Sequence, residues 1–354
     1  MKNLQEPCQK SAAEIVALID DNTILSPTLS KTVNDCKKPL FIIDKDVPHY
    51  VKEAVLSVAK GKDFTLLTPF EDEGSHYDFF GITKGHTPVL LNKLYLEHDA
   101  AIVVSFVRYD SVYGYYGGKS LIFPGIGAEK SRNALLKHAL HGESFYKHPL
   151  CFAGSVKGNP IESEVLDAVM ITRQNSYFFG INLIAVEDSV KVSACGDLFM
   201  SHIKAGQEFA ALYPLPQEPT ADGVVLNLKS GSLQDNIDLV EQAVLRLKKG
   251  GRLYIDGKGL TSFGSSIFAE AFYTPKREEI FSKLLNDFSI DLFQAMILKY
   301  ICENYHIAIC SHVEEGLLRQ AGLNPITDHL RQDFLKNCSK TEEVYDAGRF
   351  TASR

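Results

Sequence analysis

The sequence predicts an α/β fold with two helix-covered sheet domains and a cleft between them. Short apolar runs alternate with segments of helical periodicity, and a proline-rich stretch divides the chain near residues 213–222. A chain of 354 residues is also long enough for two domains of ordinary size. We therefore expect an N-terminal domain over residues 1–213, a linker over 214–221 and a C-terminal domain over 222–354.

Four apolar segments in the first half are typical of buried strands. They cover residues 40–43, 64–67, 89–91 and 100–107. A helix is expected after the turn that ends at Pro48, through about Lys60. Another is expected near the N-terminus, because Ser11 and Glu14 have the spacing of a capping box.

The second half has the pattern of a parallel βαβ unit. Three prolines within residues 214–219 end regular structure before it begins. Strands are expected at residues 223–228, 253–255 and 306–310, and a helix is expected over 232–248. Two lysines and then two glycines at residues 248–251 are typical of a basic last helical turn with a glycine stop.

Composition excludes several classes of protein. The formal net charge of -7 argues against a general nucleic-acid binder, but it leaves room for a small anionic substrate in a locally basic pocket. The longest apolar run, at residues 100–107, is too short to cross a membrane. The N-terminus shows no secretory signal, and the seven cysteines form no CxxC pair. A cytoplasmic protein is expected, with its oligomeric state open.

A glycine-rich loop follows the strand expected at residues 100–107. Gly117 and Gly118 let the backbone approach an anion, while Lys119 adds a positive charge and Ser120 a hydroxyl. The glycine spacing is not that of a phosphate-binding Walker loop. We expect a phosphate or carboxylate to bind at these four residues, and the alternative is a plain tight turn.

This loop and its flanks resemble the nickel-dependent lactate racemase family. The resemblance rests on residues 81–92 (GITKGHTPVLLN), 98–104 (HDAAIVV) and 117–125 (GGKSLIFPG), in the family's order and spacing. It continues through Gly158-Asn-Pro, Gly196-Asp with His202, and the segment that begins at Gly264. It covers residues 39–322, which is most of the chain.

The resemblance implies two α/β domains with an active site in the cleft between them. It also implies a nickel pincer nucleotide, derived from nicotinic acid, that takes a hydride from the hydroxyl-bearing carbon of the substrate. In the family a histidine removes the hydroxyl proton, and return of the hydride to the opposite face inverts the carbon. Bases on both faces suit this reaction, because either enantiomer must be deprotonated.

The sequence departs from the family pattern at the residues that carry the chemistry. An ungapped alignment places Ser120 at the family's cofactor-tethering lysine, and one residue of slippage restores Lys119. Asp110 stands where the family has a histidine near nickel, although an oxygen ligand prefers harder cations. Another family histidine falls at Leu136, with His138 two positions later as a candidate base or as a polar helix residue.

The substrate-binding positions also differ. The family's early motif, Asp-x-Thr-Arg-Pro, keeps Asp44 as a candidate cofactor contact but has Val47 in place of the arginine. Arg108 or Lys45 is the candidate replacement, because one cation in a dry cleft can orient a carboxylate. Asp235 and Asp238 replace a glutamine and a lysine, and Asp235 also has the spacing of a capping box with Ser232.

The leading hypothesis is an isomerase, a racemase or epimerase, that inverts the hydroxyl-bearing carbon of a 2-hydroxy acid. A longer sugar acid is favoured over lactate, because Tyr113 and its neighbouring tyrosines can bond to several hydroxyls. The catalytic candidates are Asp110, Lys119 and His138, with the nickel nucleotide as cofactor or none. The alternative is a non-catalytic or metal-free relative that binds a nucleotide or a sugar acid in the cleft.

Overall fold

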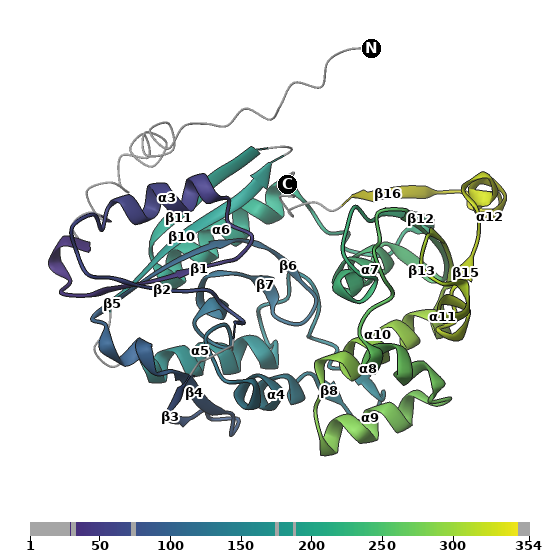
Figure 1. Cartoon of the computed structure of the whole chain (residues 1–354). Helices are drawn as coiled ribbons and strands as arrows, with labels where there is room; N and C mark the ends of the chain where they lie inside the picture. Colours follow the sequence, from purple (N-terminus) through teal and green to yellow (C-terminus); the bar gives the residue numbers. More distant parts are fainter. Residues whose placement is uncertain (1–28, 30–32, 72–75, 174–176, 187–188, 346–354) are drawn as a thin grey trace, which may run out of the picture.

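The computed structural model describes residues 29, 33–71, 76–173, 177–186 and 189–345. The helix expected near Ser11 lies outside these residues. The described chain forms two five-stranded sheets, each covered by helices, and it confirms the α/β expectation (Figure 1).

The first sheet has the strand order β11-β10-β5-β1-β2. Its neighbouring strands are parallel except for β10 and β11, which form an antiparallel hairpin. Three of the four expected apolar segments form strands of this sheet. Their side chains are buried or half-buried on both of its faces. The strands are β1 (Pro39–Ile43), β2 (Thr65–Leu67), β5 (Ala100–Phe106), β10 (Tyr177–Val186) and β11 (Ser189–Asp197).

The two faces of the first sheet carry different helices. Phe41 and Ile43 of β1 pack with Val51 of α3, whereas Leu40 and Ile42 belong to a cluster with Val165 of α5. This division follows from the alternation of side chains along a strand. The helices of this half are α3 (His49–Ser57), η1 (Lys93–Glu97), η2 (Gly118–Leu121), α4 (Glu129–Lys137), α5 (Pro160–Thr172) and α6 (Leu198–Leu212).

Three antiparallel hairpins project from this half. The segment expected at residues 89–91 lies in one of them, so its prediction as a strand is confirmed. It does not, however, join the main sheet as expected. Its apolar side chains instead pack with Leu135 of α4. The hairpins are β3 (Tyr77–Ile82) with β4 (Pro88–Asn92), β6 (Arg108–Asp110) with β7 (Gly114–Tyr116), and β8 (Leu140–His141) with β9 (Tyr146–Lys147).

The second sheet has the order β15-β14-β13-β12-β16, and all its pairs are parallel as predicted. Its strands are β12 (Ala221–Asn227), β13 (Leu247–Gly257), β14 (His306–Ser311), β15 (Asn324–Pro325) and β16 (Thr341–Tyr345). Its helices are η3 (Gln234–Asn236), α7 (Ile237–Val244), α8 (Ser266–Glu270), η4 (Ala271–Tyr273), α9 (Arg277–Asn286), α10 (Ile290–Asn304), α11 (Glu315–Gln320), η5 (Asp328–Leu330) and α12 (Arg331–Leu335).

The helix expected over residues 232–248 is shorter than predicted. It ends at Val244, and β13 begins at Leu247 after a two-residue turn. Leu247 pairs with Ala221 of β12, and the register shifts before Arg252 pairs with Gly223. Gly250 has a φ of 76°, so the glycines form an irregularity within the strand rather than a helix stop.

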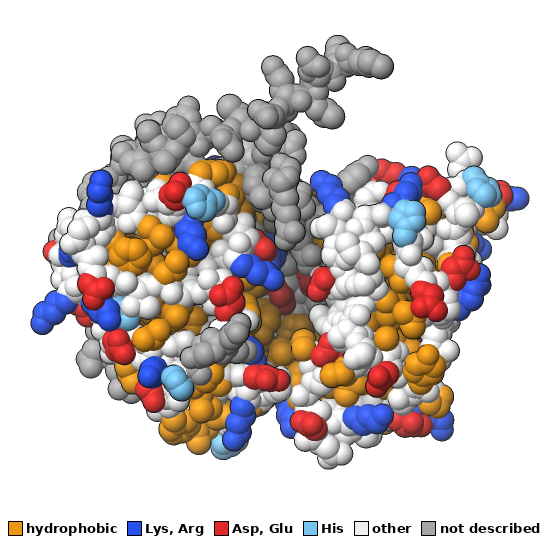
Figure 2. Space-filling view, in the orientation of Figure 1, with side chains coloured by type: hydrophobic (Ala, Val, Ile, Leu, Met, Phe, Trp, Pro, Cys, Tyr) orange, Lys and Arg blue, Asp and Glu red, His pale blue; other side chains and the backbone are white. Residues whose placement is uncertain are grey.

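The two sheets lie side by side, with the β6–β7 hairpin between them (Figure 1). One hydrophobic cluster extends through both halves, and the surface is hollowed between them (Figure 2). Residues 214–220 contain neither helix nor strand, and the domain boundary there stays a prediction. In the described residues, no helix is long and apolar enough to cross a membrane.

Candidate functional site

Two carboxylates from different halves of the chain lie close together between the sheets. Asp110 ends β6, just beyond the carboxyl end of β5, and Asp238 lies in the first turn of α7. Burial and the neighbouring charge of Asp238 raise the pKa of Asp110 to about 6. The amide of Ser111 donates to Asp238 Oδ1 at 2.6 Å, which holds the hairpin against the helix.

The backbone fixes the orientation of Asp110. Its Oδ1 atom accepts hydrogen bonds from the amides of Val112 (2.8 Å) and Tyr113 (2.7 Å). Tyr113 is a neighbour of this carboxylate, and burial together with Asp110 raises the pKa of its phenol. Asp110 therefore has one oxygen held by the turn, and a pKa close enough to neutrality for proton transfer.

Arg108 supplies a cation beside this acid pair. Its Nη1 lies 3.4 Å from Asp46 Oδ2, and its guanidinium lies 4.0 Å from the centre of the Tyr116 ring. The charges of Asp44 and Asp238 also act on it. The Arg108 side chain is 18% exposed whereas that of Asp46 is 39% exposed, so an incoming carboxylate could replace Asp46.

Asp44 completes the group at the carboxyl end of β1. Only 2% of its surface is exposed, and its Oδ2 has no hydrogen-bond partner among the described residues. Burial raises the pKa of Asp44, while Arg108 and a hydrogen bond with Tyr116 act in the opposite direction. The expected residues Asp44, Arg108, Asp110 and Asp238 thus meet where strands β1 and β5 end, the usual ligand position in such sheets.

The glycine loop does not have the exposed amides that the sequence predicts. The Gly118 amide donates to Ser105 Oγ at 2.8 Å, and the Gly117 amide donates to Ser120 Oγ at 3.1 Å. Gly118, Lys119 and Ser120 are buried. The glycines are needed for packing, since a Cβ on Gly118 would lie 2.7 Å from the His202 ring. The expectation of an open anion cradle is therefore wrong for the loop in this conformation.

Lys119 is also engaged. Its Nζ lies 2.6 Å from Glu162 Oε1, in the first turn of α5, and both side chains are largely buried. Burial and the charge of Lys119 lower the pKa of His202 to about 3, so this histidine is neutral beneath the loop. An anion would have to displace Glu162 to reach Lys119. Sequence reasoning missed Glu162, because nothing in its spacing relates it to the loop.

His138 lies outside the acid pair and has a different environment. It follows α4, and its Nε2 lies 3.1 Å from Thr87 Oγ1 and 3.6 Å from Glu164 Oε2. Glu164 also accepts hydrogen bonds from the hydroxyls of Thr83 and Thr87 and from the Gly85 amide. These contacts hold the loop between β3 and β4 and give His138 a structural role, and its role as a catalytic base stays a prediction.

Asp235 likewise has a structural role. Its Oδ2 accepts from the amide (2.9 Å) and the hydroxyl (2.7 Å) of Ser232, and its own amide donates to Ser232 Oγ. The capping-box alternative is confirmed, and these bonds occupy one oxygen of the carboxylate that we expected to contact substrate.

Comparison with known proteins agrees with this architecture. Residues 62–144 match the lactate racemase N-terminal domain family. The lactate racemase of Thermoanaerobacterium thermosaccharolyticum is 25% identical over 228 residues, which are 61% of this chain and 51% of that protein. The chain thus matches about half the length of this relative.

Two solved structures share the fold. The lactate racemase apoprotein of Thermoanaerobacterium thermosaccharolyticum superposes with a TM-score of 0.75 and 16% identity, over 97% of this chain and 94% of that one. This chain is thus similar to lactate racemase in part of its sequence and shares its fold. A Thermotoga maritima protein superposes with a TM-score of 0.63 and 15% identity, over 93% of this chain and 97% of that one.

The nickel pincer nucleotide of the lactate racemase family does not fit the residues found here. Tethering requires a free lysine amine, whereas Lys119 is held by the buried Glu162. Asp110 offers a hard oxygen donor where a soft nickel site needs nitrogen or sulfur. Among the described residues, no group of three or more His, Cys, Asp or Glu side chains is arranged to hold a metal ion.

Proposed function

We propose that this protein is an isomerase that inverts the hydroxyl-bearing carbon of a 2-hydroxy acid bound between the two sheets. The observation that carries the proposal is the meeting of one cation, Arg108, with a carboxylate pair, Asp110 and Asp238, contributed by both halves. Similarity to lactate racemase supports the same class of reaction.

In this proposal Arg108 binds the substrate carboxylate in place of the exposed Asp46. Asp110 accepts the proton of the substrate hydroxyl, since a pKa of about 6 makes a carboxylate a usable base and its acid a usable donor near neutral pH. Asp238 keeps that pKa raised from the opposite wall. Asp44 and Tyr116 are polar groups beside Arg108 that suit further hydroxyls, so the substrate class is a sugar acid rather than lactate.

The fate of the hydrogen on the inverted carbon is a separate part of the proposal. The family resemblance implies that it leaves and returns as a hydride, but Lys119 with Glu162 does not fit the family's hydride acceptor. The proposal therefore assigns the substrate carboxylate and the hydroxyl proton to this chain's own residues. Inversion by hydride removal would also need a bound two-electron acceptor, such as an oxidised pyridinium, to take the hydride and return it to the opposite face of the carbon.

The test is a chiral assay on a panel of 2-hydroxy acids deuterated at the hydroxyl-bearing carbon. We expect inversion of at least one sugar acid, loss of inversion in Asp110→Asn, and a large rise in KM in Arg108→Met. Arg319→Met, at an exposed residue of α11, is the matched control and should behave as wild type. Retained deuterium would indicate hydride return, whereas exchange with solvent would indicate proton transfer at carbon.

The alternative is a relative that binds a sugar acid without turning it over. The buried Lys119–Glu162 pair favours it, because that pair occupies the residue on which the family's chemistry depends. Binding that Arg108→Met abolishes, with no inversion of any acid in the panel, would establish this alternative.

A further inference from the structure

The backbone of Ser111, the residue after Asp110, is bonded to side chains on two other elements. Its amide donates to Asp238 Oδ1 at 2.6 Å, and its carbonyl accepts from Lys147 Nζ at 2.7 Å. Asp238 lies on α7 of the second half, whereas Lys147 lies on β9 of the first half. The residue beside the candidate base is therefore held where the two halves meet.

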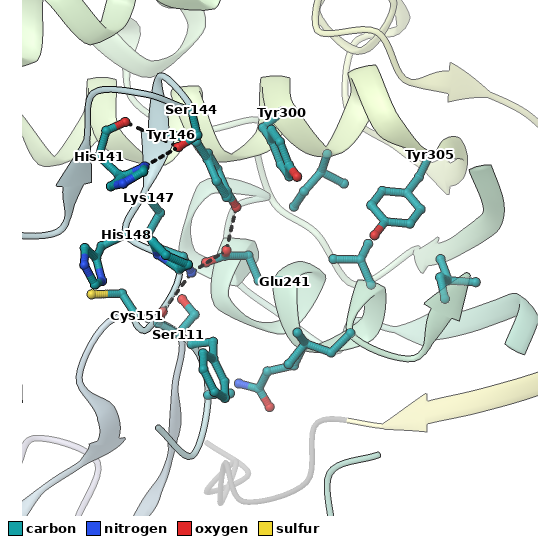
Figure 3. A pocket seen from close by; sticks show the side chains of 18 of the residues that line it. Ser111, His141, Ser144, Tyr146, Lys147, His148, Cys151, Glu241, Tyr300 and Tyr305 are labelled. Atoms are coloured by element: carbon teal, nitrogen blue, oxygen red, sulfur yellow. Dashed lines mark hydrogen bonds and ion pairs between the residues drawn. The ribbon is translucent and has the colours of Figure 1, made fainter. Parts of the chain in front are cut away.

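Lys147 is itself fixed by a second carboxylate of the same helix. Its Nζ lies 2.5 Å from Glu241 Oε1, which also accepts from the Tyr146 hydroxyl at 2.9 Å. Figure 3 shows Lys147 between Ser111 and Glu241, at the wall of a pocket of about 510 Å³. Because Glu241 follows Asp238 by three positions, both carboxylates lie on one face of α7. This helix thus holds the Ser111 amide directly and the Ser111 carbonyl through Lys147.

The other oxygen of Asp238 is held by Gln242. The Gln242 Nε2 atom donates to Asp238 Oδ2 at 2.7 Å, from one turn further along α7. Asp238 therefore has one oxygen on the Ser111 amide and the other on Gln242, which fixes the direction of its carboxylate. Because Lys147 holds the turn and Gln242 holds the carboxylate, the approach of Asp110 to Asp238 is set from both sides.

Stability alone does not account for the Lys147–Glu241 pair. The two side chains are 5% and 9% exposed, and a buried ion pair is often no more stabilising than an apolar pair of similar volume. Asn159 already holds the turn from the first half, since its amide donates to the Val112 carbonyl at 2.9 Å. What the ion pair adds is a contact with Ser111 itself.

We propose that Lys147 and Gln242 are positioning residues that hold the Asp110 carboxyl group beside Asp238. They act through the Ser111 backbone and through the Asp238 carboxylate. The inference rests on the proposed role of Asp110 as the base of the isomerase. Its test begins with a measurement that needs no turnover.

This measurement follows the Asp110 carboxyl group by carbon-13 NMR of the full chain, with aspartate labelled at the carboxyl carbon. Asp110→Asn assigns the signal. The titratable groups that interact with this carboxyl are Asp238 from α7, Arg108 and Tyr113 from its own hairpin, and Cys151. In wild type the pKa of Asp110 should be about 6, because burial and Asp238 both disfavour the charged form.

Lys147→Met combined with Glu241→Leu should lower this pKa to about 5 or below. The double substitution removes one positive and one negative charge, so the net charge near the base is unchanged. Apolar neighbours alone would raise the pKa through poorer solvation, so a fall would report movement of the turn. Lys38→Met with Glu97→Leu is the matched control, because this ion pair precedes β1 and β5, whose opposite ends carry the site. It should leave the pKa unchanged.

Gln242→Met covers the case in which the double variant does not fold. Gln242 is half-buried, and methionine keeps an unbranched side chain of similar length. Without its donor, Asp238 holds a proton more readily and repels the charge of Asp110 less. The pKa of Asp110 should therefore again fall to about 5 or below. Gln217→Met, at an exposed residue, is the control and should leave it at about 6.

Turnover distinguishes this inference from the proposed function. If wild type inverts a hydroxy acid, kcat should fall at least about tenfold in both variants. KM should change less than about twofold, because the contacts of Arg108 with Asp46 and Tyr116 are left in place. A fall in pKa without any turnover by wild type would support the positioning role and contradict the proposed function. A pKa of Asp110 that stays at its wild-type value in every folded variant would overturn the positioning role, whatever the turnover.

Discussion

Replacing Asp110 with asparagine should stabilise the protein while removing its candidate base. Asparagine has nearly the same shape and keeps an oxygen that can accept from the amides of Val112 and Tyr113. It removes the charge that burial and Asp238 disfavour. Sites adapted for chemistry are often unfavourable for stability in this way.

The size of the effect follows from the pKa of Asp110. In the folded chain it is raised from an ordinary 3.8 to about 6. Between these two values the native state holds a proton that the unfolded state has lost, so stability falls as pH rises through this window. One unit of pKa shift corresponds to about 1.4 kcal/mol, so the loss of folding stability above this window is at most about 3 kcal/mol. The Asp110→Asn variant should not show this loss.

The assay is urea unfolding of both proteins at a series of pH values. We expect the two stabilities to be similar near pH ~4 and the variant to gain about 1–3 kcal/mol above pH ~6. Asp46→Asn, which alters a half-exposed carboxylate in the turn after β1, is the control and should change stability by less than about 0.5 kcal/mol. A variant less stable than wild type at neutral pH, or a gain independent of pH, would refute the reasoning.

Three further predictions concern the framework. Lys147→Met should cost about 3–5 kcal/mol in urea unfolding because Glu241 stays buried without its partner, and adding Glu241→Leu should recover most of that loss. Gly118→Ala should cost about 1–3 kcal/mol, since φ is 54° and the new Cβ would crowd the His202 ring; unchanged stability would mean that the loop relaxes easily. Limited proteolysis should cut first within residues 214–220, and two fragments divided elsewhere would contradict the expected boundary.

The sequence predicted strands best where burial is strongest. Residues 40–43 and 100–107 are apolar almost without interruption, and both became central strands of the first sheet. The predicted end of the helix was wrong at residues 245–251, because Leu247 fits the helical period as well as it fits a strand. The pairing of Leu247 with Ala221 makes this segment a strand rather than a helix. The pattern of apolar residues within the segment carries no information on Ala221, which lies elsewhere in the chain.

The candidate site could be predicted residue by residue but not as an arrangement. Arg108, Asp110 and Asp238 were each recognisable from their positions relative to family motifs, yet nothing in the sequence brings Asp238 to Asp110. The pair of Lys147 and Glu241 had no sequence signal at all, because 94 residues separate its members. Such contacts depend on how the two halves pack.

The motifs that identify the family are here the residues that build its scaffold. Gly118 makes room for His202, and Asn159 caps α5 while its amide donates to the Val112 carbonyl. Glu164 ties together the loop that contains Thr83 and Thr87. A lineage can keep these packing requirements while its chemistry changes, since fold and function are separable. The proposed function of this protein therefore rests on Arg108 and the Asp110–Asp238 pair, which the motifs do not include.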